Sequence, residues 1–449
     1  MPRSRVRARL LLAPHLPTLA LAALFGAATL PAQDELARVR EWFADALPSR
    51  GAPPDIAQAL SRDDATKWLP KVVQAWRDGA AHADELALAT PADGPAAAVE
   101  QQLVLGDATM PYVLFTKGTR PANGWPMFLC LHGGGGNSDA TGPHAWDVNT
   151  GEWQAQRSLA ARLYPSPGFY FVPRMPDDRQ GRWWFQTCQR AFDGVIRAAL
   201  RRFDVDPDRV HLLGISEGGY GAIRFAGNRP DRFAACNAMA AAEPLATSPP
   251  ETMRNVALRI DIGERDTMFD RIGLARTMAE RLATLRAADP HGYVFELAVQ
   301  EGRGHGIDYR QGPRWLVDKV RDPNPARIVW TVQPFHDVVP RHCYWLTVPE
   351  PPARLPLYLA ATLHERGLAL TAEQDDPAQP GKRIAARGVR LVVRLDDTHV
   401  DLDRPLSLRV NGAARPDVVV ERRLATMLRT LDERGDGRFC SPAELSIEL

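Results

Sequence analysis

The sequence predicts a protein of the α/β class, with a mostly parallel sheet covered by helices on both faces and a smaller β-rich module behind it. Three observations support this fold class. Continuous apolar runs at 126–131 and 168–172 are typical of strands buried on both faces. Such runs alternate with helical patterns up to Asp322. Beyond that residue, short strand-like runs recur between proline, glycine and aspartate breaks, which favours a sandwich-like module.

The composition is that of a soluble globular protein. The chain has 449 residues, enough for two or three domains, with 45% apolar and 24% charged residues. Its formal net charge of +1 gives no reason to expect a nucleic-acid partner. The five cysteines are far apart and odd in number, so they do not indicate a disulfide framework, although one pair could be bridged. Cys130 and Cys236 lie in apolar runs and are expected to be buried thiols.

The first 32 residues have the features of a secretory signal peptide. Arginines at positions 3, 5, 7 and 9 precede an apolar stretch at 19–30, and cleavage is expected after Ala32 or after Ala28. The apolar run is shorter than the ~20 residues that span a bilayer, although an uncleaved anchor is the alternative. We therefore expect an exported protein, periplasmic or extracellular, without stable membrane insertion after cleavage.

Three segments are expected after the signal. Residues 33–98 show apolar residues at helical spacing and predict a helical N-terminal segment without chemistry of its own. Residues 99–322 predict the α/β domain, and residues 323–449 the β-rich module. Strands are expected at 103–105, 112–115, 126–131, 168–172, 209–213, 256–262 and 293–299, and helices at 192–203, 219–225 and 272–287. In the module, strands are expected at 327–331, 344–348, 355–362, 368–372, 388–395 and 406–410.

A serine lies at a predicted strand–turn–helix junction. The apolar run 209–213 leads into Gly214-Ile215-Ser216-Glu217-Gly218, and a helical pattern follows. This G-x-S-x-G context is that of a nucleophile elbow, in which glycines are needed because the serine occupies a strained turn. The helix that follows points its first N–H groups at the site. Ser216 is therefore the candidate nucleophile.

A base and an acid follow in the chain order that α/β-hydrolases use, which is serine, acid, histidine. His305 stands between glycines in the loop after the last predicted strand of the domain, which favours a general base over an ordinary surface histidine. Asp266 follows the preceding strand and is the candidate acid. Asp270 and Glu264 are rivals, with a helix N-cap and a solvated charge as their alternative roles.

A glycine-rich loop follows an early buried strand and predicts an oxyanion hole. In Leu131-His132-Gly133-Gly134-Gly135-Gly136-Asn137, Gly133 or Gly134 is the expected backbone donor. The N–H of Glu217, the residue after the serine, is the expected second donor. The carboxylate of Glu217 is expected to turn away and to pair with Arg174 or Arg182.

Two aromatic residues near the site have two interpretations. Trp183 and Trp184 either line a pocket for an acyl or aryl group or pack in the core at a helix start. No cofactor is expected, because the chain lacks a phosphate-binding glycine loop. No metal is expected either: the run 432–444 is similar to a calcium loop, but Arg434 occupies its third position and the glutamate falls one residue late.

The segments 206–221 and 229–235 resemble secreted α/β-hydrolases of the feruloyl esterase and polyhydroxybutyrate depolymerase-like (esterase D-like) group. The likeness extends from about 126 to 315. It implies an α/β-hydrolase fold, a triad of Ser216, Asp266 and His305, and an oxyanion role for the run 132–134. The tail resembles the C-terminal extension of many exported bacterial hydrolases and implies no substrate.

These observations lead us to expect a secreted serine carboxylesterase that acts through an acyl-enzyme on Ser216. Its substrate would be a small ester or an ester attached to a polysaccharide. A serine peptidase of the prolyl-oligopeptidase type is the alternative, disfavoured because no propeller-sized region precedes the domain. A non-catalytic binding protein is a third class, against which the ordered triad argues. The sequence determines neither the substrate nor the oligomeric state.

Overall fold

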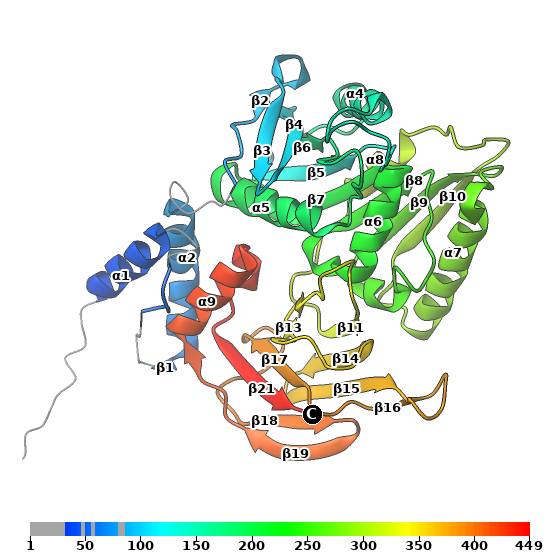
Figure 1. Ribbon diagram of the computed structural model, residues 1–449. Helices are drawn as coiled ribbons and strands as arrows, with labels where there is room; N and C mark the ends of the chain where they lie inside the picture. Colours follow the sequence, from blue (N-terminus) through cyan, green and yellow to red (C-terminus); the bar gives the residue numbers. More distant parts are fainter. Residues whose placement is uncertain (1–31, 46–49, 55–58, 80–85) are drawn as a thin grey trace, which may run out of the picture.

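The computed structural model describes residues 32–45, 50–54, 59–79 and 86–449. The predicted signal peptide lies outside these ranges except for Ala32, where the first helix begins. Among the helices that are described, none is both long and apolar enough to cross a membrane. Figure 1 shows a large mixed α/β part, two N-terminal helices beside it, and a β-rich part at the C-terminal end of the chain.

A mostly parallel sheet forms the centre of the large part. Its strands are β2 (Ala92–Asp93), β3 (Gln101–Leu105), β4 (Ala108–Lys117), β5 (Trp125–Leu131), β6 (Gly168–Pro173), β7 (Val205–Ile215), β8 (Ala235–Met239), β9 (Ala257–Gly263) and β10 (Phe295–Gln300). Their order is β10-β9-β8-β7-β5-β6-β4-β2, with β3 paired to β4. The pairs from β10 to β6 are parallel, whereas β4 runs antiparallel to β6 and β3. The carboxyl ends of β5, β7, β9 and β10 therefore meet at one edge.

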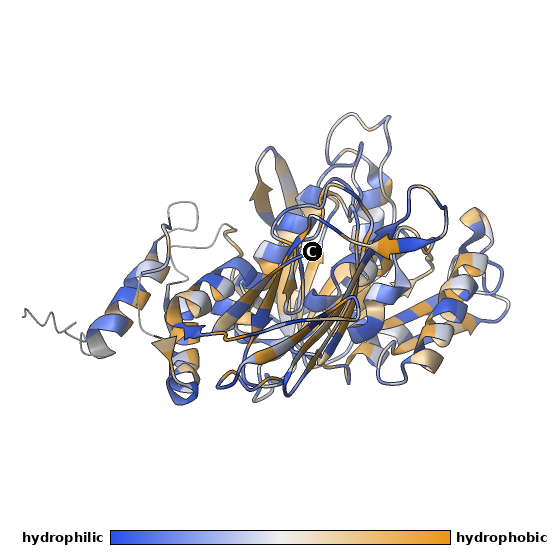
Figure 2. Ribbon diagram, turned by 90° about the horizontal axis from the view of Figure 1, so that it is seen from below, coloured by the Kyte–Doolittle hydropathy of each residue, from blue (hydrophilic) through white to orange (hydrophobic). Residues whose placement is uncertain are grey.

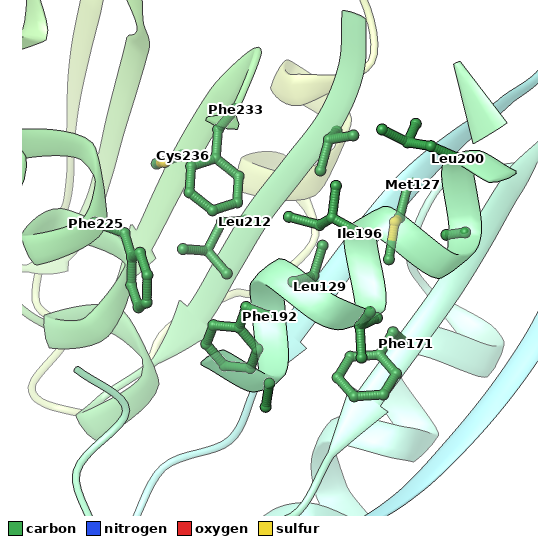
Figure 3. Packing of buried hydrophobic residues seen from close by; sticks show 14 of the residues in the cluster. Met127, Leu129, Phe171, Phe192, Ile196, Leu200, Leu212, Phe225, Phe233 and Cys236 are labelled. Atoms are coloured by element: carbon green, nitrogen blue, oxygen red, sulfur yellow. The ribbon is translucent and has the colours of Figure 1, made fainter. Parts of the chain in front are cut away.

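Helices cover both faces of this sheet (Figure 1). They are α4 (Asp147–Arg162), α5 (Gln186–Arg202), α6 (Glu217–Asn228), α7 (Arg271–Ala288) and α8 (Gln311–Leu316), with short 3-10 turns η2 (Pro95–Ala97), η3 (Pro230–Arg232), η4 (Pro250–Asn255) and η5 (Met268–Asp270). Figure 3 shows Phe192 of α5 and Phe225 of α6 beside Leu129 and Leu212 of the sheet. On the other face, α4 and α8 share a second core with β5 to β9.

The double coverage explains the continuous apolar runs of the sequence. A strand that contacts helices on both sides buries successive side chains in opposite directions, so both must be apolar. Residues 127–132, which form the end of β5 and the first residue of the next loop, are all fully buried. In Figure 2 the strands near the middle of the molecule carry mostly the hydrophobic colour, whereas the peripheral helices carry both colours. The predicted α/β-hydrolase fold, with its parallel sheet and a serine turn after β7, is confirmed.

The N-terminal helix α1 (Ala32–Ala44) packs against α2 (Arg62–Asp78), and α2 packs against α5 of the α/β part and against α9 (Leu424–Arg434). Ser61 caps α2, since its hydroxyl accepts from Asp64 N–H at 3.1 Å. Trp76 of α2 and Leu428 of α9 belong to the same apolar core as Val195 of α5. Figure 1 shows α9 between α2 and the rest of the C-terminal part. A helix from the far end of the chain thus completes the core of the α/β part.

The C-terminal part contains two sheets that share one apolar core. The first sheet has the order β11-β14-β15-β18-β19, with β16 paired to β15, and the second β12-β13-β17-β21. The strands are β11 (Arg327–Val332), β12 (His342–Cys343), β13 (Leu346–Thr347), β14 (Leu357–His364), β15 (Gly367–Asp375), β16 (Arg383–Ala385), β17 (Arg390–Leu395), β18 (Leu406–Val410), β19 (Ala413–Val418) and β21 (Ala443–Glu448); η6 spans Gly437–Phe439, and β1 (Ala59–Leu60) pairs with β20 (Arg422–Arg423). Trp330 of β11 and Leu391 of β17 meet in this core, as in a sandwich.

Buried ion pairs join the C-terminal part to the α/β part. Arg434, at the end of α9, pairs with Asp231 after α6, and both side chains are almost fully buried. Arg321, in the connecting segment, contacts Asp208 at 3.1 Å and Asp436 at 2.8 Å. Burial alone would raise the pKa of Asp231, but Arg434 and the neighbouring arginines outweigh it and hold that pKa below its usual value. We refer to Asp208, Asp231, Arg321, Arg434 and Asp436 as the ionic cluster.

The expected strands and helices of the α/β part are all present, with shifted ends. Residues 147–162, 235–239 and 424–434 form α4, β8 and α9, which the sequence analysis did not predict. All five cysteines are buried and free, which includes the two that were expected to be core thiols.

Candidate active site

Ser216 occupies a strained turn between β7 and α6. Its φ is 50° and its ψ is −112°, a conformation that a non-glycine residue rarely adopts. A Cβ atom at Gly214 would lie 2.1 Å from the carbonyl carbon of Gly218, and one at Gly218 would lie 2.3 Å from Leu131 O. The turn closes only with glycines at both positions, as the pentapeptide predicted. The serine hydroxyl is consequently presented at the carboxyl edge of the sheet.

The structure brings Ser216, His305 and Asp266 together. His305 Nε2 lies 3.1 Å from Ser216 Oγ, and His305 Nδ1 lies 2.7 Å from Asp266 Oδ2. With Nδ1 protonated toward the carboxylate, Nε2 is free to accept the serine proton. The Asp266 side chain is 2% exposed, whereas the His305 side chain is 47% exposed. The acid is therefore shielded from water while the histidine remains open to a substrate.

The two rival acids lie elsewhere. Glu264 is exposed, and its carboxylate accepts from Gly302 N–H at 2.9 Å. Asp270 is also exposed and immediately precedes α7, where its carboxylate faces Gly273. Of the three candidates, Asp266 is the one that contacts His305.

Arg271 was not singled out from the sequence, yet it contacts the candidate acid. Its Nη1 donates to Asp266 Oδ1 at 3.1 Å, and its Nε donates to the Tyr220 hydroxyl at 2.6 Å. Tyr220 lies on α6, one turn after Ser216. One guanidinium thus connects the acid loop to the helix that carries the serine. The contact joins a loop to the helix that follows it, and no pattern in the sequence marked Arg271.

The glycine loop after β5 approaches Ser216. A Cβ atom at Gly133 would lie 3.5 Å from Ser216 Cβ, so the Gly133 backbone faces the serine. The N–H of Gly135 donates to Asn149 Oδ1 at 3.0 Å and is used within the fold. Gly133 and Gly134 remain the expected donors to an oxyanion, opposite the N–H of Glu217 at the start of α6.

A buried polar network holds this loop. Asn149 of α4 also donates to Gly135 O at 2.8 Å and to Asp178 Oδ1 at 2.7 Å. Arg174 forms a bidentate pair with Asp178, at 3.0 and 2.8 Å. His132 is fully buried, accepts from Met175 N–H at 2.9 Å, and has its pKa lowered to about 3 by burial. The His132 ring is therefore neutral and fixes the loop.

Glu217 pairs with Arg182, one of the two expected partners. Arg182 Nε lies 3.4 Å from Glu217 Oε1, whereas Arg174 is bound to Asp178 instead. A Cβ atom at Gly135 would lie 3.2 Å from the Glu217 carboxyl carbon, so this carboxylate lies against the glycine loop. Burial raises the pKa of Glu217 to about 7, with Arg182 opposing that shift. The carboxyl group next to the serine is thus partly protonated near neutral pH.

The expectation that Trp183 contacts a substrate is wrong, and the core-packing alternative is correct for it. Its side chain is fully buried, and its indole N–H donates to His132 O at 3.0 Å. Trp184 is 9% exposed, and the Arg224 guanidinium lies 3.8 Å from its ring centroid. Both rings belong to the apolar core of the α/β part, because the chain enters α5 with these side chains turned inward.

Ser216, His305 and Asp266 bring a hydroxyl, an imidazole and a carboxylate to the carboxyl edge of the sheet. In the part of the chain that the structure describes, no three His, Cys, Asp or Glu side chains are grouped as metal ligands. A cavity of about 700 Å³ lies beside Val205 and Arg77, at the start of β7, and hence at the opposite end of that strand from Ser216. That cavity therefore lies apart from the Ser216, His305 and Asp266 side chains.

Comparison with known proteins identifies a sequence relative. The chain is 32% identical over 156 residues to a Nocardia uniformis subsp. tsuyamanensis protein named "Putative esterase NocK". The match covers 34% of this chain and 43% of that protein, so the chain spans less than half the length of this relative. No protein-family model matches the chain.

Comparison with solved structures gives partial matches to esterases. A thermostable esterase matches with 21% identity and a TM-score of 0.37, over 50% of this chain and 63% of that one. A feruloyl esterase module from Clostridium thermocellum matches with 14% identity and a TM-score of 0.34, over 49% of this chain and 85% of that one. Each likeness spans about half of this protein.

Proposed function

We propose that this protein is an exported serine hydrolase that cleaves carboxylic esters through an acyl-enzyme on Ser216. The observation that carries the proposal is the chain of contacts from Ser216 Oγ through His305 to Asp266, at 3.1 and 2.7 Å, at the carboxyl edge of the sheet. The partial similarity to an esterase-named protein supports ester rather than amide cleavage.

The mechanism follows from the positions of the groups. Ser216 Oγ attacks the ester carbonyl carbon while His305 Nε2 takes its proton, and Asp266 stabilises the imidazolium. The N–H groups of Gly133 or Gly134 and of Glu217 stabilise the negative oxygen of the tetrahedral intermediate. His305 then gives the proton to the leaving alkoxide. A water molecule, activated in the same way, releases the acid from Ser216.

The test combines a fluorophosphonate probe with a substrate panel. Wild-type protein should be labelled at Ser216 and should hydrolyse short p-nitrophenyl esters, whereas Ser216→Ala should lose both activities by several orders of magnitude and remain folded. Residual activity near that of the wild type would show that Ser216 is only a turn residue. A panel with aryl esters, alkyl esters and aminoacyl amides distinguishes the two functions. An esterase should have its largest kcat/KM with an ester, and a peptidase with an amide.

Export is supported by the basic and apolar pattern of the first 32 residues. Expression of the full-length chain in a Gram-negative host should yield a mature form in the periplasm. Sequencing of its N-terminus should find Gln33, or Thr29 if the upstream site is used. An intact N-terminus in the cytoplasmic fraction would contradict this part of the proposal.

A further inference from the structure

Arg271 shares the carboxylate of Asp266 with the catalytic histidine. Arg271 Nη1 lies 3.1 Å from Oδ1, and His305 Nδ1 lies 2.7 Å from Oδ2 of the same group. The Arg271 and Asp266 side chains are 6% and 2% exposed. Both charges are therefore shielded from water. Their attraction is stronger in this buried position than it would be on the surface.

The backbone before Arg271 adopts a costly conformation. Phe269 and Asp270 have φ values of 55° and 56°, and left-handed backbone is strained for residues other than glycine. The turn closes on the acid, because Ile272 N–H donates to Asp266 O at 3.1 Å. This turn directs the next side chain, that of Arg271, back to the carboxylate.

The position of Arg271 in its helix is also unfavourable. It is the first residue of α7, where the positive end of the helix dipole repels a cation, and the first turn of α7 contains no acidic residue. Burial of a guanidinium adds a desolvation cost. The hydrogen bonds to Asp266 and Tyr220, together with the Phe269 ring 5.1 Å from the guanidinium, oppose these costs.

The pair changes what protonation of His305 does to the buried charge. With a neutral imidazole, Asp266 and Arg271 cancel, and protonation creates a net positive charge in the cluster. Without Arg271, protonation would instead neutralise a buried carboxylate and would be favoured. A like charge disfavours the charged form of an ionisable group, so the guanidinium opposes protonation of the imidazole that shares its carboxylate.

We propose that Arg271 is a positioning residue that fixes Asp266 and keeps His305 neutral, and thus able to accept the serine proton, at lower pH than the triad alone would allow. This inference rests on the proposed function, since it requires His305 to act as the base. Arg271 acts through Asp266 and does not contact the reacting atoms.

Other charged and titratable groups surround the triad, and the Arg271 and Arg276 variants below leave them unchanged. They are Glu152 of α4 beside Gly133, the Arg182–Glu217 pair, the Arg224–Glu243 pair and Tyr220 on and near α6, and Arg303 and Tyr309 in the loop around His305. These groups are the same in wild type and in the Arg271 and Arg276 variants, so they do not contribute to the difference between the labelling curves.

The experiment measures the rate of fluorophosphonate labelling of Ser216 as a function of pH. Arg271→Lys keeps the charge, Arg271→Gln keeps a hydrogen-bond donor without the charge, and Arg271→Met removes both. Arg276→Met is the matched control, because Arg276 is exposed on the same helix. Tyr220→Phe removes the second hydrogen bond and leaves the charge.

If the proposal holds, the acid limb of the Gln and Met variants moves to higher pH by about one unit. The Lys, Arg276→Met and Tyr220→Phe proteins keep the acid limb of the wild type. Folded Gln and Met variants with an unshifted limb would overturn the proposal. If the Met variant does not fold, the comparison of Gln with Lys decides. An unlabelled wild-type protein would instead refute the proposed function itself.

Discussion

Three carboxylates near Ser216 are each paired with an arginine. The three pairs are Asp266 with Arg271, Glu217 with Arg182, and Glu243 with Arg224. Unpaired negative charge near an oxyanion hole would oppose the negative charge that develops on the substrate oxygen in the transition state. Local pairing allows these acidic side chains to lie near the serine without that penalty.

The assignment of the acid can be tested at single residues. Asp266→Asn should slow fluorophosphonate labelling of Ser216 by about 10³-fold or more, because the amide cannot hold the imidazole in the required tautomer. Asp270→Asn and Glu264→Gln should label at nearly the wild-type rate, since neither side chain contacts His305. A slow Asp270→Asn protein beside a fast Asp266→Asn protein would contradict the assignment.

Glu217 should make folding stability depend on pH. Its pKa is about 7 in the folded protein, against 4.5 for an ordinary glutamate, so the folded state binds its proton more tightly than the unfolded chain. This contribution is fully present below pH 4.5 and is lost as the pH rises through about 7. The side chain of the Glu217→Gln variant does not titrate. The free energy of unfolding of this variant, relative to that of wild type, should therefore rise by roughly 1–3 kcal/mol from about pH 4 to about pH 8.

Urea denaturation at the two pH values measures this difference. Exposed Glu264→Gln is the matched control and should show the same difference from wild type at both. A pH-independent difference for Glu217→Gln would contradict the prediction.

At the level of elements, patterns that depend on local backbone geometry were predictable. The elbow glycines, the buried central strands and the loops after β9 and β10 follow from turn sterics and from burial on both faces. Chain order could therefore bring Ser216, Asp266 and His305 to the same edge of the sheet. The helix α4 could not, because its buried face contains Asn149 and Gln156 beside a single tryptophan, and thus lacks an apolar stripe.

Contacts across the fold left no local signal. Arg271 and Asn149 act through partners that only the folded chain brings near them. Trp183 illustrates the reverse case. Its position in a loop above the sheet suggested a pocket wall, but the chain turns before α5 and buries the ring. In the C-terminal part, the helix α9 was missed because the surrounding strand-like runs dominate the pattern.

The element α4 should control the glycine loop through one amide. Asn149→Ala removes hydrogen bonds to both backbone groups of Gly135, so the loop should move and kcat/KM for a p-nitrophenyl ester should fall about 10–100-fold. Gln156→Ala is the matched control, because Gln156 is also a buried amide of α4 but contacts Tyr164. Equal rates for both variants would show that Asn149 supports only the helix.

At the scale of the whole molecule, the ionic cluster connects the two parts of the chain. Arg434→Met leaves Asp231 buried without its main partner and should lower the free energy of unfolding by about 3–5 kcal/mol. Arg423→Met removes an exposed pair with Glu421 and should cost less than about 1 kcal/mol. Thermal unfolding of the two proteins, compared with wild type, measures the contrast. Similar small losses would mean that the cluster contributes little to the stability of the fold.

The packing of α9 has a consequence for the time course of synthesis. Leu424, Met427, Leu428 and Leu431 belong to the same core as the central sheet, yet a ribosome adds them after the whole sheet has been made. The nascent α/β segment therefore lacks part of its interior until α9 (Leu424–Arg434) has been made. For a chain exported as proposed here, that delay favours an unfolded, translocation-competent state during synthesis. Completion of the core of the α/β part then waits for the synthesis of α9.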